Sequence, residues 1–232
     1  MPRRALRGDS DSFPRGVRCR HRTRRNIKPV KRRATGAPRR SKTAATRRGL
    51  LVFTEGEKTE DGYLLPWRRQ YRDSVLITID PFHGTPRSLV DRAVETKRAE
   101  SRDERRGRGR AHDEIWCVFD IDEHPNIPDA IQKAEAHGIQ LAISNPCIEL
   151  WFILHFEDHT AYLDRHVAQS RSSTLLQCGK TLTPEATGIL YDAFEPARDR
   201  ALSLDRKHAG DDSPVRANPS SSVWTLIESI RA

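Results

Sequence analysis

Two aspartates stand one residue apart at the end of the most apolar stretch of the chain. Residues 115–119 form an unbroken apolar run that is followed by Asp120 and Asp122. A run rich in β-branched and aromatic residues is typical of a strand buried on both faces. Two ionised carboxylates at a strand end repel each other unless a cation lies between them, and one or two carboxylates commonly hold Mg²⁺ beside a phosphate substrate. The pair therefore predicts a metal site, although Asp120 ending the strand and Asp122 capping the next segment would produce the same pattern.

A further carboxylate, Glu55, follows the first apolar run of the chain and precedes a glycine. Glycine allows the tight turn that lets a carboxylate face a crevice and the backbone approach a phosphate. Lys58 could neutralise a phosphoryl oxygen, or it could be a solvated loop lysine. Glu57 or Glu60 could be an outer ligand of the metal, although a solvent-facing position is expected for each. The loop has no GxxxxGK[ST] motif, which excludes a P-loop, and no GxGxxG motif supports a dinucleotide site.

Four polar residues are candidates for outer positions of the same site. His124 follows the acid pair and could act as a general acid, contact a phosphate, or only form a turn. Glu149 lies in an apolar run, where a carboxylate must be paired, hydrogen-bonded or metal-bound to tolerate burial. It is either a further acid of the site or the charge at a helix N-terminus. Ser144 and Asn145 end another apolar run and could contact a phosphate.

Strand and helix patterns alternate around these residues. Apolar runs predict strands at 50–53, 75–79, 115–119 and 139–143, and helical spacing or capping signals predict helices at 61–71, 86–102, 128–138, 148–156, 184–191 and 221–230. This alternation implies crossover connections and a mostly parallel sheet, whose strand ends share one edge where ligands bind. We therefore predict an α/β fold with helices flanking the sheet, in which Glu55, Asp120 and Asp122 converge at that edge.

The charge of the chain is divided unevenly. Of 41 Lys and Arg residues, 18 lie in residues 1–50 with only 2 of the 32 acids, which leaves 23 basic and 30 acidic residues in the remainder, a balance of −7. The basic segment lacks the apolar residues needed to fold alone, so we predict a disordered tail over 1–48, a catalytic core over 49–160 and a helical C-terminal extension over 161–232 packed on the core. The tail could hold nucleic acid phosphates through a salt-sensitive attraction, or be a solvated leader without a role.

The sequence also indicates where in the cell the protein is expected. No apolar run reaches 18 residues and no apolar signal core stands near the N-terminus, so no membrane association is expected. The four cysteines are far apart and form no CxxC pair, which argues against a zinc site or a disulfide scaffold and suits the cytoplasm.

Four ordered motifs resemble the RloB-like family: residues 53–60, 116–124, 143–151 with His155-Phe156, and Asn218-Pro219-Ser220. Members of this bacterial family are associated with restriction and abortive-infection loci, often beside an ATPase gene. More distantly, a glutamate–glycine pair and a DxD pair that follow strands are similar to the Toprim domain. That resemblance implies a Toprim-like sheet in which Glu55, Asp120 and Asp122 bind Mg²⁺ or Mn²⁺ for phosphodiester chemistry, with Glu55 as an acid–base residue.

The leading hypothesis is a Mg²⁺-dependent nuclease of an anti-phage defence system. RNA, with tRNA as one candidate, and DNA are both open as substrates. The alternative is a non-catalytic nucleic-acid-binding or regulatory subunit, in which the acids hold a structural ion and an ATPase partner encoded nearby does the work. The trigger of activity, the identity of the partner and the oligomeric state are not set by the sequence.

Overall fold

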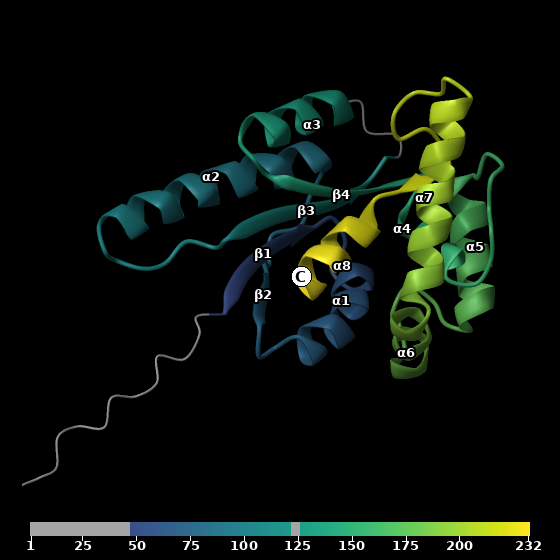
Figure 1. Cartoon of the computed structure of the whole chain (residues 1–232), viewed down its shortest axis with the longest axis horizontal. Helices are drawn as coiled ribbons and strands as arrows, with labels where there is room; N and C mark the ends of the chain where they lie inside the picture. The colour runs from purple at the N-terminus through teal and green to yellow at the C-terminus, as the bar shows by residue number, and fades with distance from the viewer. Residues whose placement is uncertain (1–46, 122–125) are drawn as a thin grey trace, which may run out of the picture. The chain divides into compact units, whose positions relative to one another are not determined.

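The computed structural model of the chain describes residues 47–121 and 126–232. Within them, five strands form one sheet in the order β2-β1-β3-β4-β5 (Figure 1). The strands are β1 (Arg48–Thr54), β2 (Val75–Ile79), β3 (Glu114–Asp120), β4 (Gln140–Asn145) and β5 (Ser220–Ser221). The first four are parallel to their neighbours, and β5 is antiparallel to β4. The predicted α/β class with a mostly parallel sheet is confirmed, and the short antiparallel edge strand is an addition to it.

Eight helices surround this sheet in the described residues. They are α1 (Thr59–Gln70), α2 (Pro86–Arg105), α3 (Ile127–Ala136), α4 (Ile148–Leu154), α5 (Arg165–Leu176), α6 (Pro184–Asp192), α7 (Phe194–Gly210) and α8 (Val223–Arg231). All six predicted helices are present with ends shifted by a few residues. The sequence did not predict α5 and α7.

The side chains of the parallel strands alternate between two cores. In β1, Leu51 and Phe53 pack in the cluster that α2 and α3 cover, whereas Leu50 and Val52 pack in the cluster that includes α1, α4 and α8. Figure 1 shows α2 and α3 on one side of the sheet and α1 and α8 on the other. Burial on both faces is why these strands read as continuous apolar runs.

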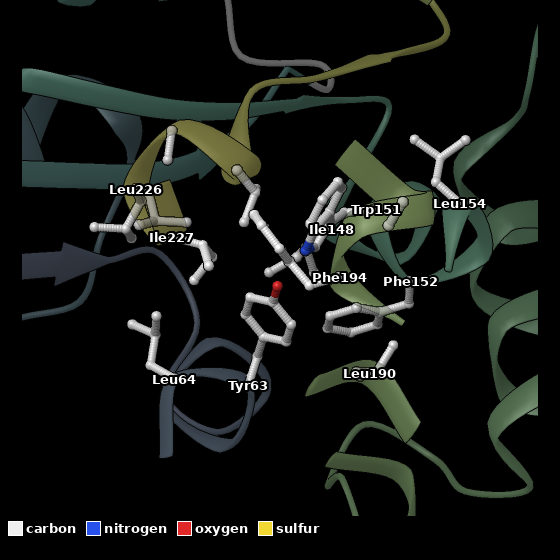
Figure 2. Packing of buried hydrophobic residues seen from close by; sticks show 14 of the residues in the cluster. Tyr63, Leu64, Ile148, Trp151, Phe152, Leu154, Leu190, Phe194, Leu226 and Ile227 are labelled. Atoms are coloured by element: carbon white, nitrogen blue, oxygen red, sulfur yellow. The ribbon is translucent and has the colours of Figure 1, made fainter. Parts of the chain in front are cut away.

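The larger core is built around aromatic side chains from α1 and α4 (Figure 2). The ring of Tyr63 lies edge-on to Trp151, with 6.4 Å between centroids, and 5.6 Å from the ring of Phe152. Leu226 and Ile227 of α8 approach the same cluster (Figure 2). Helix α4 is buried on nearly all sides, as a sequence that is apolar except for Glu149 predicted.

The chain after residue 160 contributes to this core as well. Residues of α5 to α8 belong to the larger cluster, and Ser222 N–H donates to the Ile143 carbonyl oxygen over 2.8 Å. At the other end of the sheet, Arg48 opens β1 and lies 3.7 Å from the Glu114 carboxylate. The division at residue 160 stays a prediction, and residues 1–46 lie outside the described residues. Among the helices that are described, none is long and apolar enough to cross a membrane.

Candidate functional site

The sheet order places a crevice at the carboxyl ends of β1 and β3. The chain leaves β1 toward β2 on one side, while β3 lies on the other side, and ligands of open α/β sheets bind at such a reversal. Glu55 N–H donates to the Val118 carbonyl oxygen over 3.0 Å, which continues the pairing of β1 with β3. Glu55 Oε2 then accepts a hydrogen bond from the Asp120 backbone N–H at 3.1 Å. The structure therefore brings together Glu55 and Asp120, as the topology predicted.

The carboxyl group of Asp120 lies in an anionic environment. Burial raises the pKa of Asp120 well above its ordinary value, and the nearby charges of Glu60, Glu55 and Glu149 raise it further, while Arg165 acts in the opposite direction. Carboxylates that destabilise each other's ionised form in this way are stabilised by a cation placed between them. The site thus has an excess of negative charge at the centre of the crevice.

Glu60 occupies a position that the sequence did not predict. A solvent-facing side chain was expected, but this interpretation is wrong, because Glu60 is only 6% exposed. The first turn of α1 directs its carboxylate under the preceding loop, where Oε1 accepts a 3.0 Å hydrogen bond from Gly56 N–H. Burial raises the pKa of Glu60. Glu57, in contrast, is exposed as expected.

Glycine at position 56 leaves the space that this carboxylate fills. A Cβ atom at Gly56 would lie 2.5 Å from Glu60 Oε2, well inside the distance at which non-bonded atoms begin to repel. Thr54 Oγ1 donates to the Gly56 carbonyl oxygen over 2.9 Å, which holds the loop from the other side. The two residues of the glutamate–glycine pair therefore have different roles. Glu55 binds the end of β3, and Gly56 leaves room for the Glu60 carboxylate beneath the loop.

The acids line a pocket of about 300 Å³ at this edge of the sheet. Its lining residues are Glu55, Gly56, Glu57, Lys58, Thr59, Glu60, Asp120, Ile148, Glu149, Arg165, Gln169 and Lys180. Glu149 lies in the first turn of α4 and also lines the pocket. Its position is therefore compatible both with a charge at the helix N-terminus and with a further acid of the site. Lys58 is exposed at the rim.

The remaining predicted residues are placed differently. Ser144 is buried, and its hydroxyl lies 3.0 Å from the Ser221 hydroxyl. Asn145 Nδ2 donates to the Arg216 carbonyl oxygen over 2.8 Å, so both side chains bind the C-terminal part of the chain, and neither lines the acidic pocket. Asp122 and His124 lie outside the described residues.

Three lining residues were missed by reasoning from the sequence: Arg165, Gln169 and Lys180. The first two belong to α5, which begins after Asp164, whose carboxylate accepts a 2.8 Å hydrogen bond from His166 N–H. The carbonyl oxygen of Lys180 accepts a hydrogen bond from Thr59 Oγ1 at 2.9 Å. The aspartate cap was a usable signal for the start of α5, but nothing local to the sequence indicated that α5 borders the acids.

The donor atoms in the pocket suit a hard cation. Carboxylate oxygens of one or two side chains, supplemented by water, are the usual ligands of Mg²⁺, and the carboxylate groups of Glu55 and Asp120 line the same pocket. Across residues 47–121 and 126–232, no three His, Cys, Asp or Glu side chains are grouped closely enough to enclose a metal ion by themselves. A metal bound here would therefore keep part of its coordination shell for water or substrate.

Fold and site define an α/β protein with an acidic pocket at the switch point of a mostly parallel sheet. The sequence model of the family described as RloB-like protein matches residues 50–230. The chain belongs to the RloB-like family. No curated protein and no solved structure matches it.

Proposed function

We propose that this protein is a Mg²⁺-dependent nuclease that hydrolyses phosphodiester bonds in RNA or DNA. The observation that carries the proposal is the meeting of Glu55 and Asp120 at the switch point of the sheet, among further carboxylates and beside Arg165. Mutually repelling acids at the ligand-binding edge of an α/β sheet are costly without a bound cation. The distant similarity of the glutamate–glycine and DxD pairs to the Toprim domain supports the same chemistry.

The residues divide into three roles. Glu55 and Asp120, with Asp122 as a further candidate, would hold the cation, which would supply positive charge to stabilise the phosphate as its oxygens become more negative. Glu55, which lines the same pocket, is the residue proposed to accept or return a proton of water. Arg165, Lys58 and Lys180, which line the pocket, contact phosphate oxygens and balance the acids.

The role in anti-phage defence rests on the family, whose members are associated with restriction and abortive-infection loci. An ATPase encoded nearby is the partner expected from that association. The competing function is a nucleic-acid-binding subunit in which the same acids hold an ion without catalysis. Cleavage and metal binding must therefore be measured separately.

The test combines a cleavage assay with thermal melts of the full chain. Purified protein is incubated with single-stranded and duplex RNA and DNA in Mg²⁺ or Mn²⁺, and melted in chelator and in metal. The variants are Glu55→Gln and Asp120→Asn, and the matched control is Asp73→Asn, whose side chain is 97% exposed outside the pocket. We expect Glu55→Gln and Asp120→Asn to abolish cleavage and Asp73→Asn to retain it.

Metal at tenfold above its Kd stabilises the folded state by about 1.4 kcal/mol, or about 3–6 °C for a domain of this size. This shift is expected for the wild type and Asp73→Asn but not for Asp120→Asn, which in chelator should melt no lower than the wild type. An unchanged shift in Asp120→Asn would refute the metal assignment. A normal shift without cleavage of any substrate would favour the non-catalytic subunit.

A further inference from the structure

Two more pockets adjoin the acidic pocket and continue it along α5. One, of about 730 Å³, extends past Asn145 to Tyr162 and Asn218. The other, of about 360 Å³, extends along α5 toward Ser173 and Leu182. Gln169 and Lys180 line all three pockets. The acids therefore lie partway along a groove rather than in an isolated cavity, and we call these three adjoining pockets the α5 groove.

Cationic and polar side chains line the α5 side of this groove together with one acid, Asp164, which borders the 730 Å³ pocket. Arg165 borders the acidic pocket and the 730 Å³ pocket, and exposed His166 borders the two outer pockets. Lys180, which borders all three pockets, is exposed to solvent. Acids on the sheet side face these groups across the groove. A polyanion can thus be held through its phosphates on one wall while one linkage reaches Glu55 and Asp120 on the other.

An aromatic side chain stands at one end of the groove. Tyr162 is 77% exposed and lines the 730 Å³ pocket. A tyrosine ring combines an apolar face with a polar hydroxyl group, so an exposed Tyr162 offers a flat surface on which a base can stack. Unpaired bases stack on such side chains whatever their sequence, whereas bases inside a duplex are already stacked on one another.

The dimensions of the groove favour a single strand. Each of its pockets has a volume in the range of a small-molecule site, about 300–1,000 Å³, which suits individual nucleotides rather than a double helix. We propose that the α5 groove binds a single-stranded segment of nucleic acid, with phosphates at Arg165 and Lys180 and an unpaired base on Tyr162. This inference deepens the proposed nuclease function and rests on it for the identity of the scissile linkage.

The experiment measures binding of the full chain in chelator, so that cleavage does not contribute. Fluorescence anisotropy is recorded with a labelled single-stranded oligonucleotide and with the same sequence as a blunt duplex, at low and at raised salt. The variants are Tyr162→Ala, Tyr162→Phe and Lys180→Ala. The controls are Lys207→Ala, which alters an exposed lysine of α7, and Val215→Ala, which alters an 84% exposed apolar residue.

Tyr162→Ala should weaken single-strand binding about fivefold to a hundredfold at raised salt, where the attraction of the basic tail is screened, and Tyr162→Phe should restore it. Lys180→Ala should lower the salt slope by about 0.7. Both controls should bind like the wild type. Equal affinity for the duplex, or unchanged binding in Tyr162→Ala and Lys180→Ala, would overturn the α5 groove even where cleavage is observed. If the Tyr162 and Lys180 variants bind as expected but the protein cleaves no substrate, the proposed nuclease function would be refuted, whereas the proposal of single-strand binding in the α5 groove would stand.

Discussion

Replacing Gly56 tests the packing of the candidate site most directly. A Cβ atom at this position would lie 2.5 Å from Glu60 Oε2 and 3.0 Å from Glu60 Oε1. Because Glu60 is buried beneath the loop, its carboxylate must move away from Gly56. That movement breaks the 3.0 Å hydrogen bond that Gly56 N–H donates to Glu60 Oε1.

The cost follows from the hydrogen bond that is broken. A hydrogen bond to a charged group contributes about 1.5–3 kcal/mol, and we expect Gly56→Ala to lower the free energy of unfolding by that amount. With about 2–4 °C per kcal/mol for a domain of this size, the melting temperature should fall by about 3–12 °C. Activity should fall as well, since the displaced carboxylate enters the pocket that Asp120 shares.

The assay is chemical denaturation of the wild type and of the variants. Gly188→Ala is the matched control, because Gly188 lies in α6 with nothing within 4 Å of its added Cβ, and alanine inside a helix should stabilise by about 0.5–1 kcal/mol. Glu60→Ala and the double variant Gly56→Ala/Glu60→Ala complete a double-mutant cycle. Removing the carboxylate removes the clash, so a coupling of at least about 1 kcal/mol is expected. Effects that add to within about 0.5 kcal/mol, or a Gly56→Ala as stable as Gly188→Ala, would refute this account of the loop.

Three further predictions concern the core and the tail. Burial lowers the pKa of His155 from 6.5 to about 4, and its Nε2 has no hydrogen-bond partner among the described residues. Below pH 6.5 the unfolded chain therefore binds a proton at His155, whereas the folded chain binds it only near pH 4. The free energy of unfolding should fall by roughly 3 kcal/mol as the pH is lowered across this window. In chemical denaturation, His155→Asn should show a flatter dependence of stability on pH, and an unchanged dependence would contradict the assignment. Trp151→Ala should lower the free energy of unfolding by about 3–5 kcal/mol, because Trp151 is 0% exposed. Trp224→Ala should lower it by less, because Trp224 is only half-buried, and thermal melts of both variants measure the difference. Deleting residues 1–46, which keeps Arg48 and the whole of β1, should weaken binding to duplex DNA and flatten its salt dependence by about 0.9 for each phosphate that the tail neutralises in the full chain. An equal slope would show that the tail does not bind phosphates.

The sequence alone determined the parallel sheet and the meeting of two of its acids. The strands of this sheet are buried on both faces, so each appears in the sequence as a continuous apolar run. Such a run can be recognised as a strand without knowing which strands lie beside it. The order of strands and helices then places Glu55 and Asp120 at one edge, because crossover connections align the carboxyl ends of parallel strands. Both inferences depend only on local composition and on the alternation of strands and helices, which makes the strands parallel.

The rest of the site was decided by contacts between distant parts of the chain. The residues of α5 that face the core are Ala168, Ser172 and Leu176, and because only Leu176 is a large apolar side chain, their periodicity is too weak to reveal the helix. Ser144 and Asn145 bind partners more than 70 residues away, and neither of them lines the acidic pocket.

Glu60 shows the same limit within a single loop. Its residue type favours solvent, and only the turn at Gly56 and the packing of α1 against the sheet place its carboxylate in the interior. Polar side chains take whichever hydrogen-bond partner the tertiary structure presents, whereas a long apolar run is buried in almost any fold. That asymmetry is why the sequence determined the core and the strand ends, and the tertiary structure alone determined which polar groups line the pocket.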